Sequence, residues 1–231
     1  MLCVKKFSPH LEILPAAQRQ LWHELNQVPA EFTLYGGTAI ALHLGHRQSV
    51  DFDFFGNRSF DPAKLQAAIP FLAGARVRQH EGNTLTATLN REGQVAVSFF
   101  GVPNLPRLVS PVVSDDNGLN IASLLDLAGT KASVVQVRPE AKDYLDLDVL
   151  ITKGGITLPM ALTAAQALYG ASFNPQITLK ALSYFEDGNL RMLPEDAKTR
   201  LAAAARDVDL DRLPSLDRLI PDKTELHDLG L

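Results

Sequence analysis

The hydrophobic periodicity of the chain changes near residue 118, and this change restricts the folds that the chain can adopt. Before it, short runs alternate apolar and polar residues, as in residues 84–90 (TLTATLN) and 94–101 (QVAVSFFG). A period of two is typical of strands that bury one face. After it, apolar residues recur at helical spacing between Gly, Pro and Asn. The pattern predicts an α+β fold, with a mixed sheet and flanking helices in residues 1–118 and a helical domain in residues 119–231.

Local signals give the expected order of elements. In the first half we expect helix 10–27, strand 32–35, helix 38–45, strand 49–55, helix 61–73 and strands 75–82, 84–90 and 94–101. In the second half we expect helices within residues 120–136, 138–154, 158–170, 174–188 and 194–209. The tail from Pro214 is expected to be a loose or docking segment.

Charge and cysteine content exclude several classes of protein. A net charge of −4 and a pI near 5.8 argue against non-specific coating of nucleic acid, which needs a broadly basic surface; a local basic groove stays compatible. The single cysteine, Cys3, has no partner for a disulfide or a thiolate metal site. No apolar run approaches the ~20 residues that span a bilayer, so we expect a cytoplasmic protein without a membrane partner.

Two aspartates lie two residues apart in the expected strand 49–55 (SVDFDFF). Strand residues two apart point to the same face, with Cα atoms about 6.6 Å apart at ~3.3 Å per residue. Asp51 and Asp53 are therefore expected side by side, while Phe52 and Phe54 point into the core. Two carboxylates presented in this way suit Mg²⁺, which also binds water and substrate phosphate. The pair predicts a magnesium site for phosphoryl or nucleotidyl transfer.

A glycine turn precedes this strand. Gly36 and Gly37 lack a Cβ atom, so a phosphate can approach their backbone, and a helix that Thr38 caps offers N–H groups to an anion. Arg47 is a candidate for bidentate binding of a phosphate oxygen, and the Ser49 hydroxyl for contact with the same group. These five residues predict a triphosphate site beside the metal.

Other basic residues have two interpretations each. Arg76, Arg78 and His80 alternate along an expected strand, so they form either a solvated edge or a basic strip for an RNA or protein acceptor. His43 and His46 are three residues apart, but no further metal ligands accompany them. We therefore expect His43 to pack.

Two stretches together resemble a known family. Residues 36–55 (GGTAIALHLGHRQSVDFDFF) resemble the signature of the DNA polymerase β-type nucleotidyltransferase superfamily. Their R-x-S-x-D-x-D-F form is similar to that of the AbiEii/AbiGii-type nucleotidyltransferase toxins. Residues 127–147 (LAGTKASVVQVRPEAKDYLDL) resemble the downstream motif of the same toxins.

This resemblance implies a polymerase β-like core and a Mg²⁺-dependent enzyme that transfers a nucleoside monophosphate from an NTP to an acceptor hydroxyl. It also implies tRNA or protein as the acceptor, a role as the toxin of a toxin–antitoxin system, and a cognate antitoxin as partner. Residue by residue, Lys131 would contact the triphosphate, and Asp143 or Asp146 would orient Lys131 or serve as a base.

The sequence departs from the superfamily at one position. Most members carry a third carboxylate on a neighbouring strand, where this chain has Ser98. Deprotonation of the acceptor would then fall to Asp143, Asp146, water or the acceptor itself. Two alternatives stay open: a small-molecule adenylyltransferase of the kind that inactivates antibiotics, and a nucleotide-binding or partner-binding module that has lost turnover.

The candidate residues also have purely structural interpretations. Asp51 and Asp53 would form a solvated strand face, and Gly36 and Gly37 a simple turn. In the second motif, Lys131 would be an exposed helix residue. Asp143 and Asp146 would form surface ion pairs with Lys142 and its neighbours.

Overall fold

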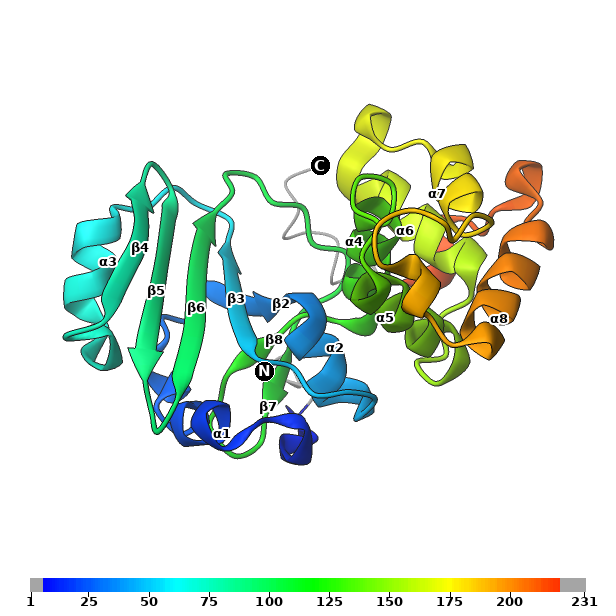
Figure 1. Ribbon diagram of the computed structural model, residues 1–231. Helices are drawn as coiled ribbons and strands as arrows, with labels where there is room; N and C mark the ends of the chain where they lie inside the picture. The colour runs from blue at the N-terminus through cyan, green and yellow to red at the C-terminus, as the bar shows by residue number, and fades with distance from the viewer. Residues whose placement is uncertain (1–5, 221–231) are drawn as a thin grey trace. The chain divides into compact units, whose positions relative to one another are not determined.

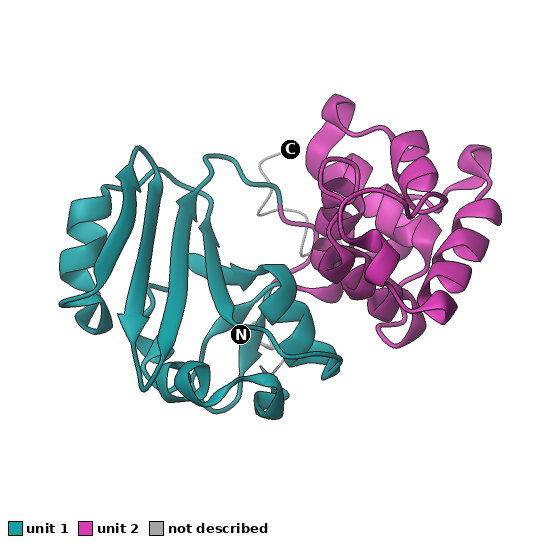
Figure 2. Ribbon diagram, in the orientation of Figure 1, with its two compact units in different colours: residues 1–106, 111–122 teal, residues 107–110, 123–231 magenta. Residues whose placement is uncertain are grey.

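The computed structural model describes residues 6–220, and the chain divides into two compact units (Figure 2). Unit 1 consists of residues 1–106 and 111–122, and unit 2 of residues 107–110 and 123–231. The sequence predicts a division between residues 118 and 119. In the structure the second unit begins at residue 123, and the short segment 107–110 groups with it. Cys3 lies outside the described residues.

Unit 1 is built on a mixed sheet whose eight described strands follow the order β1-β7-β8-β2-β3-β6-β5-β4 (Figure 1). Parallel pairing joins β1 to β7, β2 to β8 and β3 to β6, and the other neighbours are antiparallel. The bounds are β1 Lys6–Phe7, β2 Phe32–Tyr35, β3 Asp51–Gly56, β4 Arg76–Glu81, β5 Thr84–Asn90, β6 Gln94–Gly101, β7 Val112–Ser114 and β8 Asn120–Ile121. With the helices of unit 2, this sheet confirms the predicted α+β fold.

One face of the sheet is packed against helices. Phe54 stacks on Phe99 with ring centroids 5.1 Å apart, and Trp22 of helix α1 lies 6.5 Å from Phe52. The helices of unit 1 are α1 Ala16–Trp22, α2 Gly36–Leu44 and α3 Pro62–Ala68. Helix α3 begins as expected, since the Asp61 carboxylate accepts hydrogen bonds from the N–H groups of Ala63 and Lys64. Phe52 and Phe54 therefore point into the core, as the alternating pattern predicted.

Some local expectations are wrong. The helix expected over residues 10–27 is interrupted: α1 begins after Pro15, and single 3₁₀ turns lie on either side of it. Strands β1, β7 and β8 were not expected. They contain two or three residues each, too few to show a period, and β1–β7 and β2–β8 are pairings between distant segments of the chain.

Unit 2 is helical, as expected. Its helices are α4 Leu124–Val134, α5 Ala141–Thr152, α6 Leu158–Tyr169, α7 Pro175–Ala181, α8 Glu195–Arg206 and α9 Leu216–Leu219. Gly129 lies in the middle of α4 because α6 approaches closely there: an added Cβ atom would lie 2.9 Å from Leu168 Cδ1. Residues of α4 and α6 thus pack almost backbone to backbone at this point.

Asp126 explains why residues 107–110 belong to unit 2. Its buried carboxylate accepts hydrogen bonds from the N–H groups of Leu108 (2.9 Å) and Val109 (3.1 Å) and from the Ser123 hydroxyl (2.5 Å). Burial raises the pKa of Asp126, and these hydrogen bonds oppose the rise. The segment is therefore fixed to the first turn of α4.

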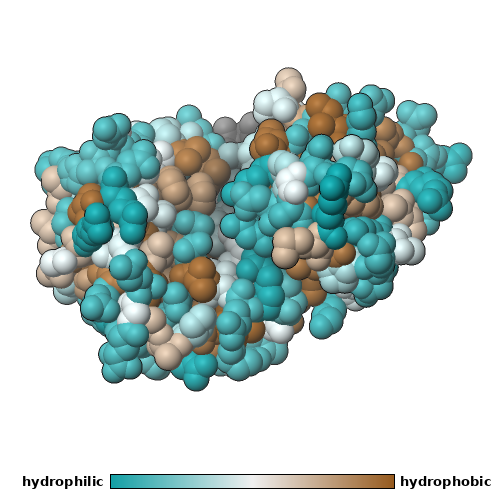
Figure 3. Space-filling model, in the orientation of Figure 1, coloured by the Kyte–Doolittle hydropathy of each residue, from teal (hydrophilic) through white to brown (hydrophobic). Residues whose placement is uncertain are grey.

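The start of the tail is docked on unit 2. Thr163 Oγ1 of α6 donates to the Pro214 carbonyl at 2.9 Å, and α9 follows; residues 221–231 of the expected tail lie outside the described part. Hydrophilic side chains cover most of the face drawn in Figure 3, with smaller hydrophobic patches on each unit. Among residues 6–220, no helix combines the length and apolarity needed to cross a bilayer.

Candidate functional site

The carboxylates of Asp51 and Asp53 share one face of β3. Exposure alternates along the strand: Asp51 is exposed, Asp53 is half-buried, and the phenylalanines between and after them are buried. Phe55 shares the face of the aspartates, and its ring lies 4.9 Å from that of Phe100 on β6. We call this side of β3 and its neighbouring strands the open face.

Gly36 brings the start of α2 against Asp53. Strand β2 ends at Tyr35, which pairs with Asp53, so the next residue meets the Asp53 side chain. A Cβ atom added to Gly36 would lie 3.3 Å from Asp53 Oδ2, and its φ of +75° lies in the left-handed region. Both the contact and the backbone therefore favour glycine. Gly37 is the second residue of α2.

Thr38 does not cap α2, which corrects the sequence expectation. The helix begins two residues earlier, at Gly36, because the positive φ of this glycine turns the chain directly out of β2. The Thr38 hydroxyl is buried and donates to the Asp51 carbonyl, and Ser49 Oγ lies 2.7 Å from Thr38 Oγ1. Thr38 and Ser49 thus clamp the start of β3 onto the first turn of α2.

Ser98 occupies the expected third-carboxylate position. It lies directly beside Asp53 in the parallel pair of β3 and β6, and its side chain is buried. Arg47, in the loop before β3, is half-buried, and its guanidinium donates to the Gln48 carbonyl at 3.0 Å.

The open face fits a divalent cation held by few protein ligands. Within residues 6–220, no cluster of three or more His, Cys, Asp or Glu side chains could form a complete metal cage. Asp51 and Asp53 offer hard oxygen ligands on one face, which suits Mg²⁺ because this ion keeps water and phosphate in its remaining positions.

The second motif forms a buried ion cluster within unit 2. Lys131 Nζ of α4 lies 2.5 Å from Asp143 Oδ1 and 2.8 Å from Asp146 Oδ2, both on α5. The second oxygen of Asp143 accepts from Arg138, whose Nη2 is 2.7 Å away. Both carboxylates are fully buried, and the Lys131 side chain is only 6% exposed. Two cations therefore balance the charge of two buried carboxylates.

This cluster rules out the surface interpretation of the three residues. Lys131 is buried rather than exposed on its helix. Lys142 pairs instead with Glu140, at 3.1 Å on the surface. Arg138 completes the cluster, although neither sequence motif singled it out as a site residue. Its only local signal was its place in the basic segment between Lys131 and Asp143.

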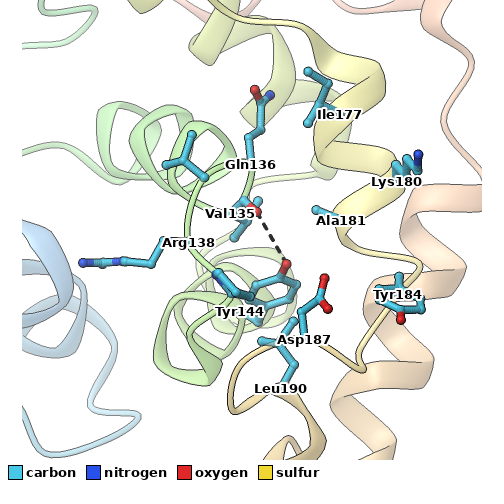
Figure 4. A pocket seen from close by; sticks show the side chains of 12 residues that line it. Val135, Gln136, Arg138, Tyr144, Ile177, Lys180, Ala181, Tyr184, Asp187 and Leu190 are labelled. Atoms are coloured by element: carbon cyan, nitrogen blue, oxygen red, sulfur yellow. Dashed lines mark hydrogen bonds between the residues drawn. The ribbon is translucent and has the colours of Figure 1, made fainter.

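A cavity of about 270 Å³ adjoins this cluster inside unit 2 (Figure 4). Arg138, Tyr144 and Asp187 contribute to its lining, together with residues of α7. Tyr144 lies 3.5 Å from the Val135 carbonyl through its hydroxyl, and burial, Asp187 and Asp143 raise the pKa of Tyr144 to about 12. The phenol is therefore neutral at physiological pH.

The structure also shows where His43 and the basic residues of β4 lie. His43 packs as expected: its ring stacks on Phe7 at 4.7 Å, and its Nε2 lies 2.9 Å from the Ala122 carbonyl. The expectation that Arg76, Arg78 and His80 share a strand face is wrong. Arg76 pairs with Thr88 on the open face, whereas His80 pairs with Leu85, whose side chain is in the core.

Known proteins are similar to this chain in sequence or in fold. A family model described as "Nucleotidyl transferase AbiEii toxin, Type IV TA system" matches residues 20–221. The uncharacterized protein aq_aa25 of Aquifex aeolicus (strain VF5) is 34% identical over 159 residues, which cover 68% of this chain and 75% of that protein.

Two solved structures have the same fold. MenT4, the nucleotidyltransferase toxin Rv2826c from Mycobacterium tuberculosis H37Rv, matches with a TM-score of 0.54 at 16% identity, over 91% of this chain and 89% of MenT4. A protein from H. pylori described as a nucleotidyltransferase matches with a TM-score of 0.51 at 15% identity, over 82% of this chain and 92% of that one. The family match covers most of the sequence, and the chain is a nucleotidyltransferase that belongs to the AbiEii toxin family of type IV toxin–antitoxin systems.

Proposed function

We propose that the chain transfers a nucleoside monophosphate from an NTP to an acceptor hydroxyl on tRNA or protein, with Mg²⁺ bound by Asp51 and Asp53. The observation that carries this proposal is the geometry of the open face. Asp51 and Asp53 point to one side of β3, and the backbone of Gly36 lies against the Asp53 carboxylate. A phosphate at the start of α2 would therefore lie next to the Asp53 carboxylate.

The start of α2 is the proposed triphosphate site. Gly36 and Gly37 have no side chains to exclude a phosphate, and the first N–H groups of a helix favour an anion. Thr38 and Ser49 hold the site in place, because their hydroxyls connect the first turn of α2 with the start of β3. For Arg47 we propose neutralisation of a phosphate oxygen.

A divalent cation bound to Asp51 and Asp53 would supply charge neutralisation for the triphosphate. In the reaction the acceptor oxygen forms a bond to the α-phosphorus, and the bond to the bridging oxygen breaks, which releases pyrophosphate. Ser98 has no carboxylate to accept the acceptor proton, so we assign that proton to water.

Asp143 and Asp146 suit an orienting role better than the role of a base. Both are fully buried, and both oxygens of Asp143 already accept hydrogen bonds, one from Lys131 and the other from Arg138, which leaves them poorly placed to reach an acceptor hydroxyl. Two carboxylates hold the Lys131 ammonium in one place and use two of its three N–H donors. We propose that its third N–H is the donor available to a phosphate group.

The toxin family supports one further proposal, a cognate antitoxin as the functional partner. An antitoxin would limit transfer in the cell, so expression of the chain alone is expected to slow growth. Co-expression with the antitoxin gene is expected to restore growth, and a chain with Asp53→Asn is expected to be harmless.

The experiment that tests the proposal is a transfer assay with each α-labelled NTP, with and without Mg²⁺, on total tRNA, lysate protein and aminoglycoside or lincosamide acceptors. We expect label on tRNA or protein, and at least about 100-fold less with Asp53→Asn, since a lost metal ligand removes several kcal/mol of charge stabilisation. Glu31→Gln, an exposed carboxylate of the same unit, is the matched control. Label on a drug would establish the small-molecule alternative, and nucleotide binding without any transfer would establish the inactive module.

A further inference from the structure

We propose that the open face between β3 and β4 binds the acceptor as a single strand of RNA, and that Arg76 and Arg78 bind its phosphates. This inference rests on the proposed nucleotidyl transfer and extends it, because it selects the acceptor class and names the surface that holds it. All the residues involved belong to unit 1.

A β-bulge in β4 creates the basic end of this surface. The pairing register of β4 with β5 shifts between Val77 and Gln79, so Arg78 is an extra residue in the strand. Arg76 pairs with Thr88, and Arg78 Nε donates to the Thr88 hydroxyl at 2.7 Å. Both guanidinium groups therefore reach the same side of the sheet, two residues apart in sequence and next to a single threonine.

A row of paired residues connects the arginines with the aspartate pair across the sheet. The register aligns Asp51 with Ala96 on β6, Ala96 with Thr88 on β5, and Thr88 with Arg76 on β4. Neighbouring strands are ~4.8 Å apart, so this row spans about 14 Å. An RNA strand that crosses the sheet in this direction would place its end at the carboxylates and its phosphates at the arginines.

The side chains along this path suit RNA. Thr84, Thr86 and Thr88 are half-buried on the open face and present a row of hydroxyl groups, which hydrogen-bond to phosphate and ribose. Phe55 and Phe100 lie on the same face with rings 4.9 Å apart and partly accessible, as a base-stacking platform requires. The acidic residue of β4, Glu81, pairs with Thr84 at the opposite end of the strand from Arg76.

The bulge and the charged side chains of β4 disfavour a peptide acceptor at this edge of the sheet. An extended peptide binds a sheet by adding a strand to an edge such as β4, which ends the described strand order. The bulge disrupts the regular pattern of backbone groups, and charged side chains along β4 further oppose pairing. A polyanion needs only side chains of the open face, and among these Arg76 and Arg78 are exposed.

The test measures binding of a short fluorescein-labelled single-stranded RNA to the full chain by anisotropy, without NTP, over a range of salt concentrations. For Arg76→Gln/Arg78→Gln we expect affinity at low salt to fall by at least about tenfold. The slope of log K against log salt should fall by about 1.4, because each lost phosphate contact on a single strand removes about 0.7. Arg76→Gln alone, which breaks no hydrogen bond within the sheet, should remove about half of this slope change.

Two control variants isolate the surface. His80→Gln alters the same strand on its other face, and Arg206→Gln/Arg212→Gln removes the same charge from exposed positions of unit 2. Both should bind RNA like the wild type. Equal losses in all variants, an unchanged salt slope, or a wild-type chain that binds no RNA would overturn the inference.

The outcome is separable from that of the proposed function. Asp53→Asn should lose transfer and still bind the RNA probe. If transfer depends on Asp53 but its acceptor is a protein, and the double arginine variant labels that protein normally, nucleotidyl transfer stands and the RNA surface is wrong. If the arginines govern RNA binding but no transfer occurs with any acceptor, the surface stands and the proposed reaction is wrong.

Discussion

The two units each carry a pair of aspartates on one side of one element, yet the pairs have opposite surroundings. Asp51 and Asp53, two apart on β3, lie on the open face, and Asp51 is exposed. Asp143 and Asp146, three apart on α5, are fully buried and both contact the Lys131 ammonium. Spacings of two and three suit the periods of a strand and a helix, so each pair shares a face.

In both units, residue type and spacing bring the carboxylates together, whereas the neighbouring groups decide what the carboxylates can do. The pair on β3 includes an exposed carboxylate, Asp51, which a cation from solution can reach. A buried pair without cations would be very costly, so the protein supplies its own. This contrast supports the proposed roles, ligand binding for the pair on β3 and positioning for the pair on α5.

Among single substitutions, Asp143→Ala should have the greatest effect on stability. It leaves Lys131 and Arg138 short of a buried partner, so unit 2 should lose about 3–5 kcal/mol of unfolding free energy. Urea unfolding followed by far-UV circular dichroism measures this loss, since unit 2 is helical. Glu140→Gln, which removes an exposed partner of Arg138, should cost less than about 0.5 kcal/mol. A loss below about 1 kcal/mol for Asp143→Ala would refute the buried cluster.

In unit 1, Gly36→Ala tests the close approach of the start of α2 to the Asp53 carboxylate. A side chain at φ +75° should cost unit 1 about 1–2 kcal/mol, measured by urea unfolding with the fluorescence of Trp22. It should also lower transfer, because its Cβ atom would press on Asp53 Oδ2 at 3.3 Å. Gly74→Ala has nearly the same φ, +74°, and no neighbour within 4 Å. It should lose similar stability and keep full activity; equal activity losses would contradict the role of the contact.

Ser98→Asp would add a third carboxylate to Asp51 and Asp53 and so make a more complete metal site. A third carboxylate beside Asp53 should lower the stability of unit 1 by about 1 kcal/mol in EDTA, because like charges on neighbouring strands repel. Added Mg²⁺ should raise the melting temperature more in this variant than in the wild type, since a cation that binds only the folded state stabilises it. Ser98→Asn, which adds no charge, should show no extra response to Mg²⁺. An identical response in both variants would argue against a cation at Asp53.

The weakest of these effects should be a pH dependence from His43. Burial lowers the pKa of His43 and outweighs the hydrogen bond with the Ala122 carbonyl, which acts to raise it, so the folded state favours the neutral ring. Below its ordinary value of 6.5 the unfolded state binds more protons. The stability that the protein gains while His43 is neutral is therefore complete above pH 6.5. It declines as the pH falls toward the lower folded-state pKa.

The free-energy difference between wild type and His43→Gln should accordingly shrink from about pH 7 to about pH 5, by less than about 1 kcal/mol. Urea unfolding at each pH measures it, and carboxylates common to both chains cancel in the difference. His23→Gln, at an exposed position of α1's C-terminal end, should show no such trend. A difference that is constant with pH would show that His43 does not titrate differently in the folded state.

Much of the fold follows from local patterns. Strong alternation predicted β3, β5 and β6, and Asp61 before Pro62 predicted the start of α3. The same alternation predicted that Asp51 and Asp53 share one face of their strand. These features depend on residues close together in sequence, whose directions the period of the element fixes.

Other features could not be read locally. The bulge in β4 moved His80 away from the face of the arginines, because one extra residue reverses every later side chain. Thr38 was expected as a cap, but Gly36 turns the chain earlier. The strands β1, β7 and β8 are too short to show a period, and the pairings of β1 with β7 and of β8 with β2 join distant segments.

The α+β architecture, the aspartate pair on β3 and the family of the chain can all be read from the order of its residues. The family resemblance also pointed to Asp143 or Asp146 beside Lys131 and to Ser98 in place of a carboxylate. The burial of the cluster, the contact of both aspartates with Lys131 and the place of Arg138 cannot be read in this way. The reason is physical: periodicity fixes where a side chain points, but the charge balance of a buried group depends on atoms that other elements bring to it.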